Sequence, residues 1–200
     1  MLTETLLVVG VITFVVFVAV LLVEGARRPG YDPVFHTGSE LSLGDRGWIQ
    51  RANFLQMGVG VLAVALAVHR TLDAPVGSTL LATFGMGMLA AGVFVPDPVR
   101  GYPPGSSTGT PEKLTWQHQV HSAISGPVAF FALFGACLTL AGSLEGGWRL
   151  YTVVTAGAGL ALTATTALAW QKDAAYTGLV QRGLILVYWS WLGLLSVHLL

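Results

Sequence analysis

A long uncharged stretch begins just after Glu4. From Thr5 to Val23 the chain reads TLLVVGVITFVVFVAVLLV, and it ends at Glu24. A helix needs about 20 mostly apolar residues to cross a bilayer, so this stretch predicts a membrane-spanning helix. It is not typical of a cleaved signal peptide, because no basic segment precedes it, the apolar run is too long and no small-x-small cleavage site follows. We therefore expect a helix that is retained in the protein.

Further along the chain, five more segments are long and apolar enough to be considered as spans. Charged or strongly polar residues separate them, and the loops between the second and third segments and between the fourth and fifth are short. The sequence therefore predicts an all-α integral membrane protein, a single domain over residues 1–200 built as a bundle of six transmembrane helices. The expected spans are 5–23, 48–68, 75–95, 116–141, 149–170 and 181–200.

The composition excludes several classes of protein. Of the 200 residues, 54% are apolar and only 10% are charged, and the ten basic and ten acidic side chains cancel. Such a chain is neither disordered nor a binder of nucleic acid, because the second would need a basic surface. The single cysteine, Cys137, excludes an internal disulfide and a cysteine-based zinc site. No span contains a lysine and no nucleotide-binding motif is present, so the sequence requires no cofactor.

Glycine is abundant within the expected spans. The chain has 25 glycines, and small residues let helix backbones approach closely in lipid. We expect a tightly packed bundle from the glycines inside the spans, which are Gly58, Gly60, Gly85, Gly87, Gly92, Gly157 and Gly159.

The basic residues favour one orientation of the chain. With six spans, the three longer loops share one face and both termini share the other. All of the ten basic residues except Arg70 and Arg149 fall on the long-loop face. The excess of positive charge on cytoplasmic loops therefore predicts a protein of the cytoplasmic membrane with its long loops in the cytoplasm and both termini outside.

Polar side chains gather at the long-loop ends of several spans. His118, His121, Ser122 and Ser125 have a spacing that places them on one stripe of the fourth span. Polar residues within spans usually face the bundle interior or a water-filled cavity. We expect a ligand site here, with Asp97 and His121 as candidates for a catalytic role. The expected ligand-binding residues are Glu40, Asn53, Asp97, His118, His121, Ser122, Gln181 and Arg182.

Each of these residues also has a purely structural interpretation. Asp97 lies between two prolines and could cap the turn there or pair with Arg100. Ser122 could hydrogen-bond a neighbouring helix, and Arg182 could mark the membrane edge and meet lipid phosphates.

Two metal-binding arrangements remain as alternatives. His118 and His121 could bind a metal ion if Asp97, Glu40 or His36 supplied further ligands. On the opposite face, His69 and His198 could ligate a b-type haem, or they could be two histidines at the membrane interface.

Several motifs, taken in order, resemble one known family. They are Arg28–Pro33 with Ser39–Gly44, the stretch Gly92–Pro98, the segment Trp116–His121, and Gly178–Arg182. Together they resemble a bacterial and archaeal family of six-span membrane proteins, domain of unknown function 998, over most of the chain. The chain departs from the family at Gln119, where many relatives have glycine. The resemblance implies a prokaryotic six-helix bundle and implies no activity.

Three functions remain open from the sequence. The polar cluster of Glu40, Asp97, His121 and Arg182 could bind or process the headgroup of a membrane lipid. Alternatively, the cluster could only tie the loops together in an accessory subunit of a larger membrane complex. The third hypothesis is a metal- or haem-dependent membrane enzyme. A cavity beside the cluster would favour the first hypothesis over the second.

Overall fold

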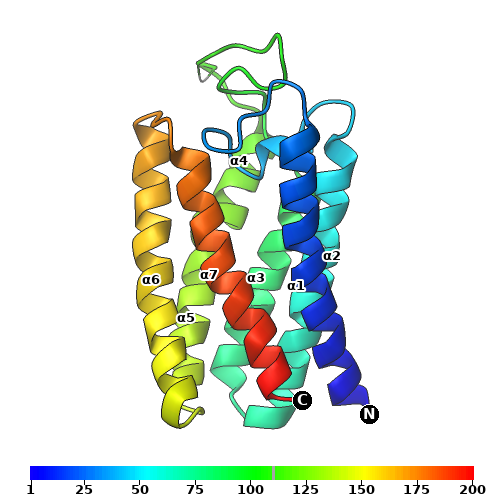
Figure 1. Ribbon diagram of the computed structural model, residues 1–200, viewed down its shortest axis with the longest axis vertical. Coiled ribbons are helices and arrows are strands. Elements are labelled where there is room, and N and C mark those ends of the chain that lie inside the picture. Colours follow the sequence, from blue (N-terminus) through cyan, green and yellow to red (C-terminus); the bar gives the residue numbers. More distant parts are fainter. Residues whose placement is uncertain (110) are drawn as a thin grey trace.

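Six helices of membrane-spanning length make up the protein. The computed structural model describes residues 1–109 and 111–200, and Figure 1 shows the helices as one upright bundle. Five spans are single helices, and the fourth is composed of α4, the π-helical turn η2 and α5. The helices are α1 (Leu2–Arg27), α2 (Gly47–Leu72), α3 (Pro75–Val93), α4 (Trp116–Ala123), η2 (Ile124–Val128), α5 (Ala129–Ala141), α6 (Gly146–Gln171) and α7 (Thr177–His198), with a short 3-10 turn η1 (Glu40–Ser42) in the first long loop.

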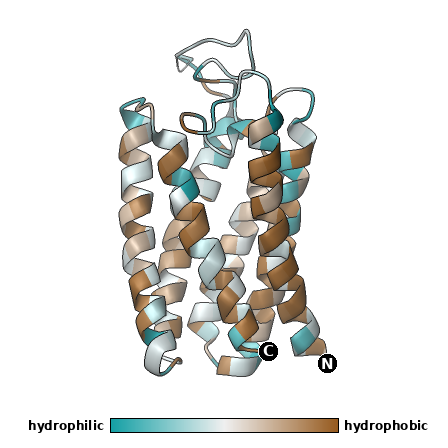
Figure 2. Ribbon diagram, in the orientation of Figure 1, coloured by the Kyte–Doolittle hydropathy of each residue, from teal (hydrophilic) through white to brown (hydrophobic). Residues whose placement is uncertain are grey.

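The expected all-α membrane bundle is confirmed. All six spans are long and apolar enough to cross a membrane, and the described residues form no β-strand beyond one isolated bridge between Val99 and Tyr102. Apolar residues dominate the middle of the bundle in Figure 2, and polar residues gather at its two ends. The helix α1 extends past the expected range 5–23 at both ends. The helix α7 begins before residue 181 because Thr177 and Gly178 already belong to its first turn.

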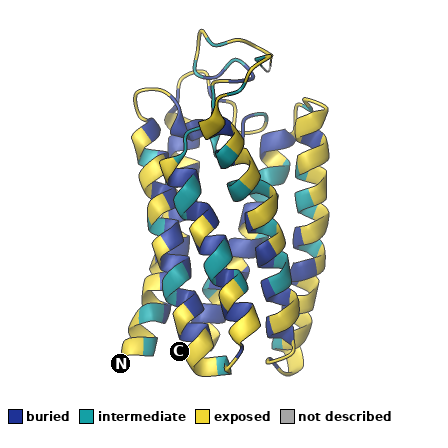
Figure 3. Cartoon of the chain, turned by 180° about the vertical axis from the view of Figure 1, so that it is seen from behind, coloured by how far each residue is buried: buried dark blue, intermediate teal, exposed yellow. Residues whose placement is uncertain are grey.

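The helices form a closed ring in chain order. Each span contacts its neighbours in sequence, and α7 closes the ring by packing against α1. Both termini lie at one end and the longer loops at the other (Figure 1). Buried aromatic side chains fill the centre, where the Trp189 ring lies 5.2 Å from Phe17 and 5.5 Å from Phe84. Seen from behind in Figure 3, exposed residues lie on the outward faces of the helices and buried residues face the interior.

Glycines allow the helices to approach closely at several crossings. A Cβ atom on Gly60 of α2 would overlap Thr13 of α1, and one on Gly159 of α6 would overlap Tyr188 of α7. A Cβ atom on Gly87 of α3 would lie 2.7 Å from Ala129. In contrast, a Cβ atom on Gly157 would meet nothing within 4 Å. Therefore most of these glycines serve packing, while Gly157 lies on an open face of α6.

The ring is loosest beside the first half of the fourth span. The helix α4 contacts α3 and η2, whereas the described residues show no comparable contact between α4 and α6 or α7. Only further along the span does α5 pack on α6. A gap therefore remains between α4 and the pair α6–α7, near the long-loop end.

The glycine contacts predict opposite effects of two identical substitutions. Gly60→Ala adds a methyl group where Thr13 already lies, and overpacking costs about 1–3 kcal/mol. Gly157→Ala adds the same group in open space and gains about 0.5–1 kcal/mol from the lower flexibility of alanine in a helix. Thermal unfolding in detergent should show a lower melting temperature for Gly60→Ala and an unchanged or higher one for Gly157→Ala. Equal losses in both variants would contradict this packing.

Candidate functional site

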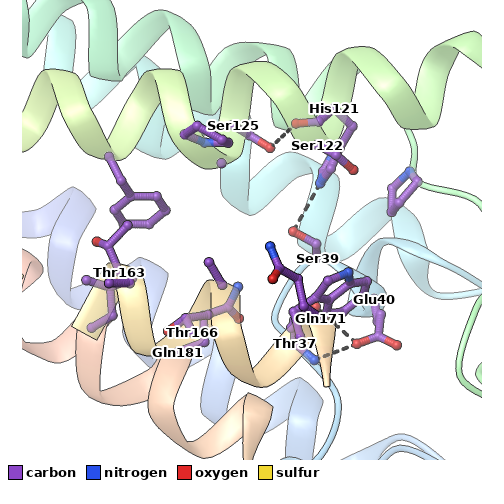
Figure 4. A pocket seen from close by; sticks show the side chains of 18 of the residues that line it. Thr37, Ser39, Glu40, His121, Ser122, Ser125, Thr163, Thr166, Gln171 and Gln181 are labelled. Carbon is purple, nitrogen blue, oxygen red and sulfur yellow. Dashed lines mark hydrogen bonds between the residues drawn. The ribbon is translucent and has the colours of Figure 1, made fainter. Parts of the chain in front are cut away.

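A cavity of about 390 Å³ fills the gap between the fourth span and the pair α6–α7. Polar lining side chains are concentrated near the long loops, and the wall deeper in the bundle is mainly apolar, with Ser125 and Thr163 as polar members. The polar wall consists of Thr37, Ser39, Glu40, His118, His121, Ser122, Gln171 and Gln181. The apolar wall includes Pro127, Phe130, Phe131, Leu160 and Leu184. Figure 4 shows His121 and Ser122 on one side of this cavity, with Thr163 and Thr166 of α6 across from them.

The cavity opens through the side of the bundle. Phe131, Leu160 and Trp170 line it, yet they are 57%, 36% and 37% exposed. These side chains belong to membrane-spanning helices, so their exposed parts would face lipid. The cavity can therefore be reached from within the membrane.

The irregular turn η2 forms part of the cavity wall. Gly126 and Pro127 interrupt the fourth span, and proline has no N–H group to donate to the preceding turn. The backbone widens here to a π-helical turn, a feature that is often found at functional sites. The Ser125 hydroxyl donates a hydrogen bond back to the carbonyl oxygen of His121. These residues shape the wall next to His121.

His121 has a partner on each ring nitrogen. Its Nδ1 lies 2.8 Å from the carbonyl oxygen of Phe94, and its Nε2 lies 3.0 Å from the hydroxyl oxygen of Ser39. A carbonyl oxygen only accepts hydrogen bonds, so Nδ1 carries the proton. In the neutral ring, Nε2 then accepts the proton of the Ser39 hydroxyl (Figure 4).

The loop that carries Ser39 is held on both sides. Its preceding residue, Gly38, donates its N–H to the Gln181 side-chain oxygen at 2.7 Å, which ties the loop to α7. The Glu40 carboxylate accepts the N–H and the hydroxyl of Thr37 at 2.6 and 3.0 Å. Burial raises the pKa of Glu40, while Thr37, His36 and Arg100 act in the opposite direction. Glu40 thus stabilises the turn that presents Ser39.

Asp97 supports the beginning of the fourth span. Its carboxylate accepts the N–H and hydroxyl of Thr115 at 2.6 and 2.8 Å, and its own N–H donates to His118 Nδ1 at 2.9 Å. Of the two structural interpretations, capping is therefore the one observed, while Arg100 pairs with Asp173 at 2.8 Å. Asp97 does not line the cavity, whereas His118 does.

Arg182 and Asn53 also lie away from the cavity. Arg182 donates to the carbonyl oxygen of His36 at 3.0 Å and to the Tyr31 hydroxyl at 2.7 Å. Burial raises the pKa of Tyr31 to about 12, although Arg182 opposes this. Asn53 donates to the Phe17 carbonyl oxygen at 3.1 Å and so joins α2 to α1. Of the eight expected ligand-binding residues, the cavity brings together Glu40, His118, His121, Ser122 and Gln181.

The described residues supply no cluster of metal ligands around His118 and His121. No group of three or more His, Cys, Asp or Glu side chains within residues 1–109 and 111–200 is arranged to hold a metal ion. Both ring nitrogens of His121 already have partners. At the opposite end, His198 stacks on Trp148 with ring centroids 4.2 Å apart, and His69 lies 3.5 Å from the Ser78 hydroxyl.

Sequence patterns do not indicate that Ser39 contacts His121. In the sequence, Ser39 is only one residue of the first-loop motif, and its partner His121 is 82 positions away. No spacing rule pairs two residues at that distance. Gln171 and Thr37 also line the polar wall, and neither belongs to a periodic pattern that would have indicated it.

A buried guanidinium fixes the long loops above the cavity. Arg28 is only 7% exposed, and it contacts the Glu24 carboxylate at 2.9 Å. It also donates to the carbonyl oxygens of Leu41 and Leu43 and to the Tyr102 hydroxyl, at 3.2, 3.0 and 3.2 Å. One side chain therefore joins the end of α1 to the first and second long loops. The spacing of Glu24 and Arg28, four residues apart on a helix, is the signal from which the sequence could have indicated this pair.

Replacing Arg28 by lysine should loosen both loops. Lysine keeps the charge but lacks the five donors of the planar guanidinium, and each hydrogen bond to a charged group contributes roughly 1.5–3 kcal/mol. We expect hydrogen–deuterium exchange in residues 29–46 and 97–105 to become about 10- to 100-fold faster in Arg28→Lys. Arg27→Lys, at the exposed neighbouring position, is the matched control and should leave exchange unchanged. Equal exchange in wild type and Arg28→Lys would show that the loops are held by other contacts.

The chain was compared with known proteins. It matches no curated protein and no solved structure. One family model does match, described as "Protein of unknown function (DUF998)", and the match covers residues 11–198. This match spans all six helices, including the segments that carry the cavity and its loop. The chain therefore belongs to the DUF998 family of membrane proteins.

Proposed function

We propose that the protein binds one membrane lipid, with the headgroup at the polar end of the cavity and an acyl chain along its apolar wall. The observation that carries this proposal is the division of a single, laterally open cavity into a polar and an apolar half. A volume of about 390 Å³ falls within the roughly 300–1,000 Å³ typical of small-molecule pockets. An amphiphile that diffuses in the membrane could enter between α4 and α6 without leaving the lipid phase.

The charges in the wall favour a neutral headgroup. Among the described residues that line the cavity, Glu40 is the one acidic side chain, and neither lysine nor arginine takes part. A phosphate group would therefore meet a carboxylate and no fixed cation, which is unfavourable at low dielectric. Hydroxyl and ester groups suit this wall better, because the side chains of Gln171, Gln181 and Ser122 can donate or accept hydrogen bonds.

The tail of such a lipid would lie against the deeper wall. Phe130, Leu160 and Leu184 line the cavity there, and Phe131 borders its lateral opening. Burying an acyl chain among these side chains removes little apolar surface from water, because the alternative environment is lipid. Specificity would therefore come mainly from hydrogen bonds at the polar end, which the lipid phase does not offer.

The placement in the cell is part of the same proposal. The basic residues of the long-loop face favour an orientation with the long loops in the cytoplasm and both termini outside. The resemblance to bacterial and archaeal proteins implies that this membrane is the cytoplasmic membrane of a prokaryotic cell. The headgroup would then lie in the cytoplasmic leaflet. An accessory subunit of a larger complex would need no such cavity, so the cavity favours lipid binding over that alternative.

Filling the cavity should remove the bound lipid. Ala164→Phe places a large side chain in the cavity wall, whereas Ala161→Phe makes the same change on an exposed part of α6 outside the cavity. In native mass spectrometry after gentle release from detergent, we expect wild type and Ala161→Phe to retain a lipid mass. Ala164→Phe should retain at least tenfold less. Equal retention in the two variants, or none in wild type, would contradict lipid binding at this cavity.

A further inference from the structure

Two side chains at the polar end of the cavity are arranged as a nucleophile and a base. The Ser39 hydroxyl lies 3.0 Å from His121 Nε2, and both residues line the cavity. We propose, on the basis of the proposed lipid binding, that Ser39 and His121 cleave an ester bond of a neutral acyl lipid bound there. The protein would then be a membrane-embedded serine esterase.

The geometry meets the requirements for activating a serine. A nucleophilic serine needs a base within about 2.6–3.2 Å, and that base must be oriented by a third group. Here the carbonyl oxygen of Phe94 is the third group, because it accepts the Nδ1–H of His121 at 2.8 Å. Nε2 is thereby left unprotonated and directed at Ser39. Phe94 follows the last residue of α3, so a rigid helix end fixes the position of the carbonyl.

Ser39 is held in place while remaining accessible from the cavity. The contacts of Gly38 with Gln181 and of Thr37 with Glu40 fix the backbone on both sides of it. Ser39 itself is half-buried and lines the main cavity. A loop that served only as a cover would not need its serine hydroxyl to face both a histidine and a cavity open to lipid.

A second, smaller cavity adjoins Ser39 on the side of the bundle core. It has a volume of about 40 Å³, and Ser39, Gln50 and Trp189 are among its lining residues. Gln50 Nε2 and Trp189 Nε1 are buried donors that have no hydrogen-bond partner in the described part of the chain. Leaving a buried N–H group unpaired costs free energy, so these groups favour an oxygen atom in that space. The oxygen that becomes negative when a serine attacks an ester carbonyl is such an atom.

The reaction is balanced with water as the second substrate. Ser39 Oγ attacks the ester carbonyl carbon, and His121 Nε2 takes the hydroxyl proton. The C–O bond to the alcohol breaks, and His121 returns the proton to the departing alcohol, which leaves an acyl group on Ser39. Water then attacks the acyl carbon while His121 Nε2 takes one of its protons, the bond from the acyl carbon to Ser39 Oγ breaks, and His121 returns the proton to Ser39 Oγ. The products are a fatty acid, an alcohol-bearing headgroup and the regenerated Ser39.

An alkyl fluorophosphonate tests this proposal directly. Such a probe forms a covalent bond to an activated serine oxygen and releases fluoride. The full-length protein in lipid nanodiscs would be treated with the probe, and the adduct would be located by intact-mass and peptide mass spectrometry. Ser39→Ala and His121→Gln are the test variants, and Ser106→Ala, in the second long loop outside the cavity, is the control. Native mass spectra of each sample would report the retained lipid.

We expect one adduct per chain, located on Ser39, in wild type and in Ser106→Ala. It should be absent in Ser39→Ala, and it should form at least 100-fold more slowly in His121→Gln, since a general base contributes about 10²–10⁴-fold. Retained lipid without an adduct on Ser39 in wild type would overturn the esterase proposal and leave lipid binding intact. Absence of both would overturn both proposals. Because the adduct is located in wild type, the test does not depend on the folding of any variant.

Discussion

The long-loop end of this protein depends on one buried guanidinium. Arg28 lies at the end of α1, where it is buried. A buried charge without partners would cost free energy because the dielectric constant there is low. The Glu24 carboxylate and carbonyl oxygens of the first long loop satisfy it, and the Tyr102 hydroxyl adds a contact from the second. The geometry of arginine, with five donors in one plane, is what allows one residue to join three segments. These contacts tie the described parts of both loops to the end of α1.

This fixed cover explains how a serine in a loop can meet a histidine in a span. Tightly packed helices exclude cavities, and the ring is tight wherever glycines allow close approach. The fourth span contains the π-helical turn at Gly126 and Pro127, and its first half, α4, packs on α3 but stays apart from α6 and α7. The first long loop closes the polar end of the resulting cavity and places Ser39 against His121. The polar and apolar halves of the cavity follow from its position across the membrane interface.

The six spans could be predicted because bilayer thickness imposes a length on every apolar stretch. The position of His118, His121 and Ser122 on one face of the fourth span could also be predicted, because helical periodicity determines it. All three side chains line the cavity. Sequence also indicates depth in the membrane, which is why Asp97 and Arg182 were expected beside His121. Depth does not determine the angle around the ring, however, and both side chains instead support loops. The π-helical turn, the Arg28 contacts and the Ser39–His121 pair depend on tertiary packing between distant residues, which periodicity cannot show.

The proposed lipid in the cavity between α4 and α6 can be detected in the membrane itself. The most direct measurement is photo-crosslinking with a neutral acylglycerol that carries a diazirine on its acyl chain, followed by peptide mapping of the protein in nanodiscs. We expect crosslinks concentrated in residues 124–131 and 160–170, and they should disappear when excess unlabelled acylglycerol competes. Crosslinks spread over the outer faces of all helices, with no loss under competition, would contradict it.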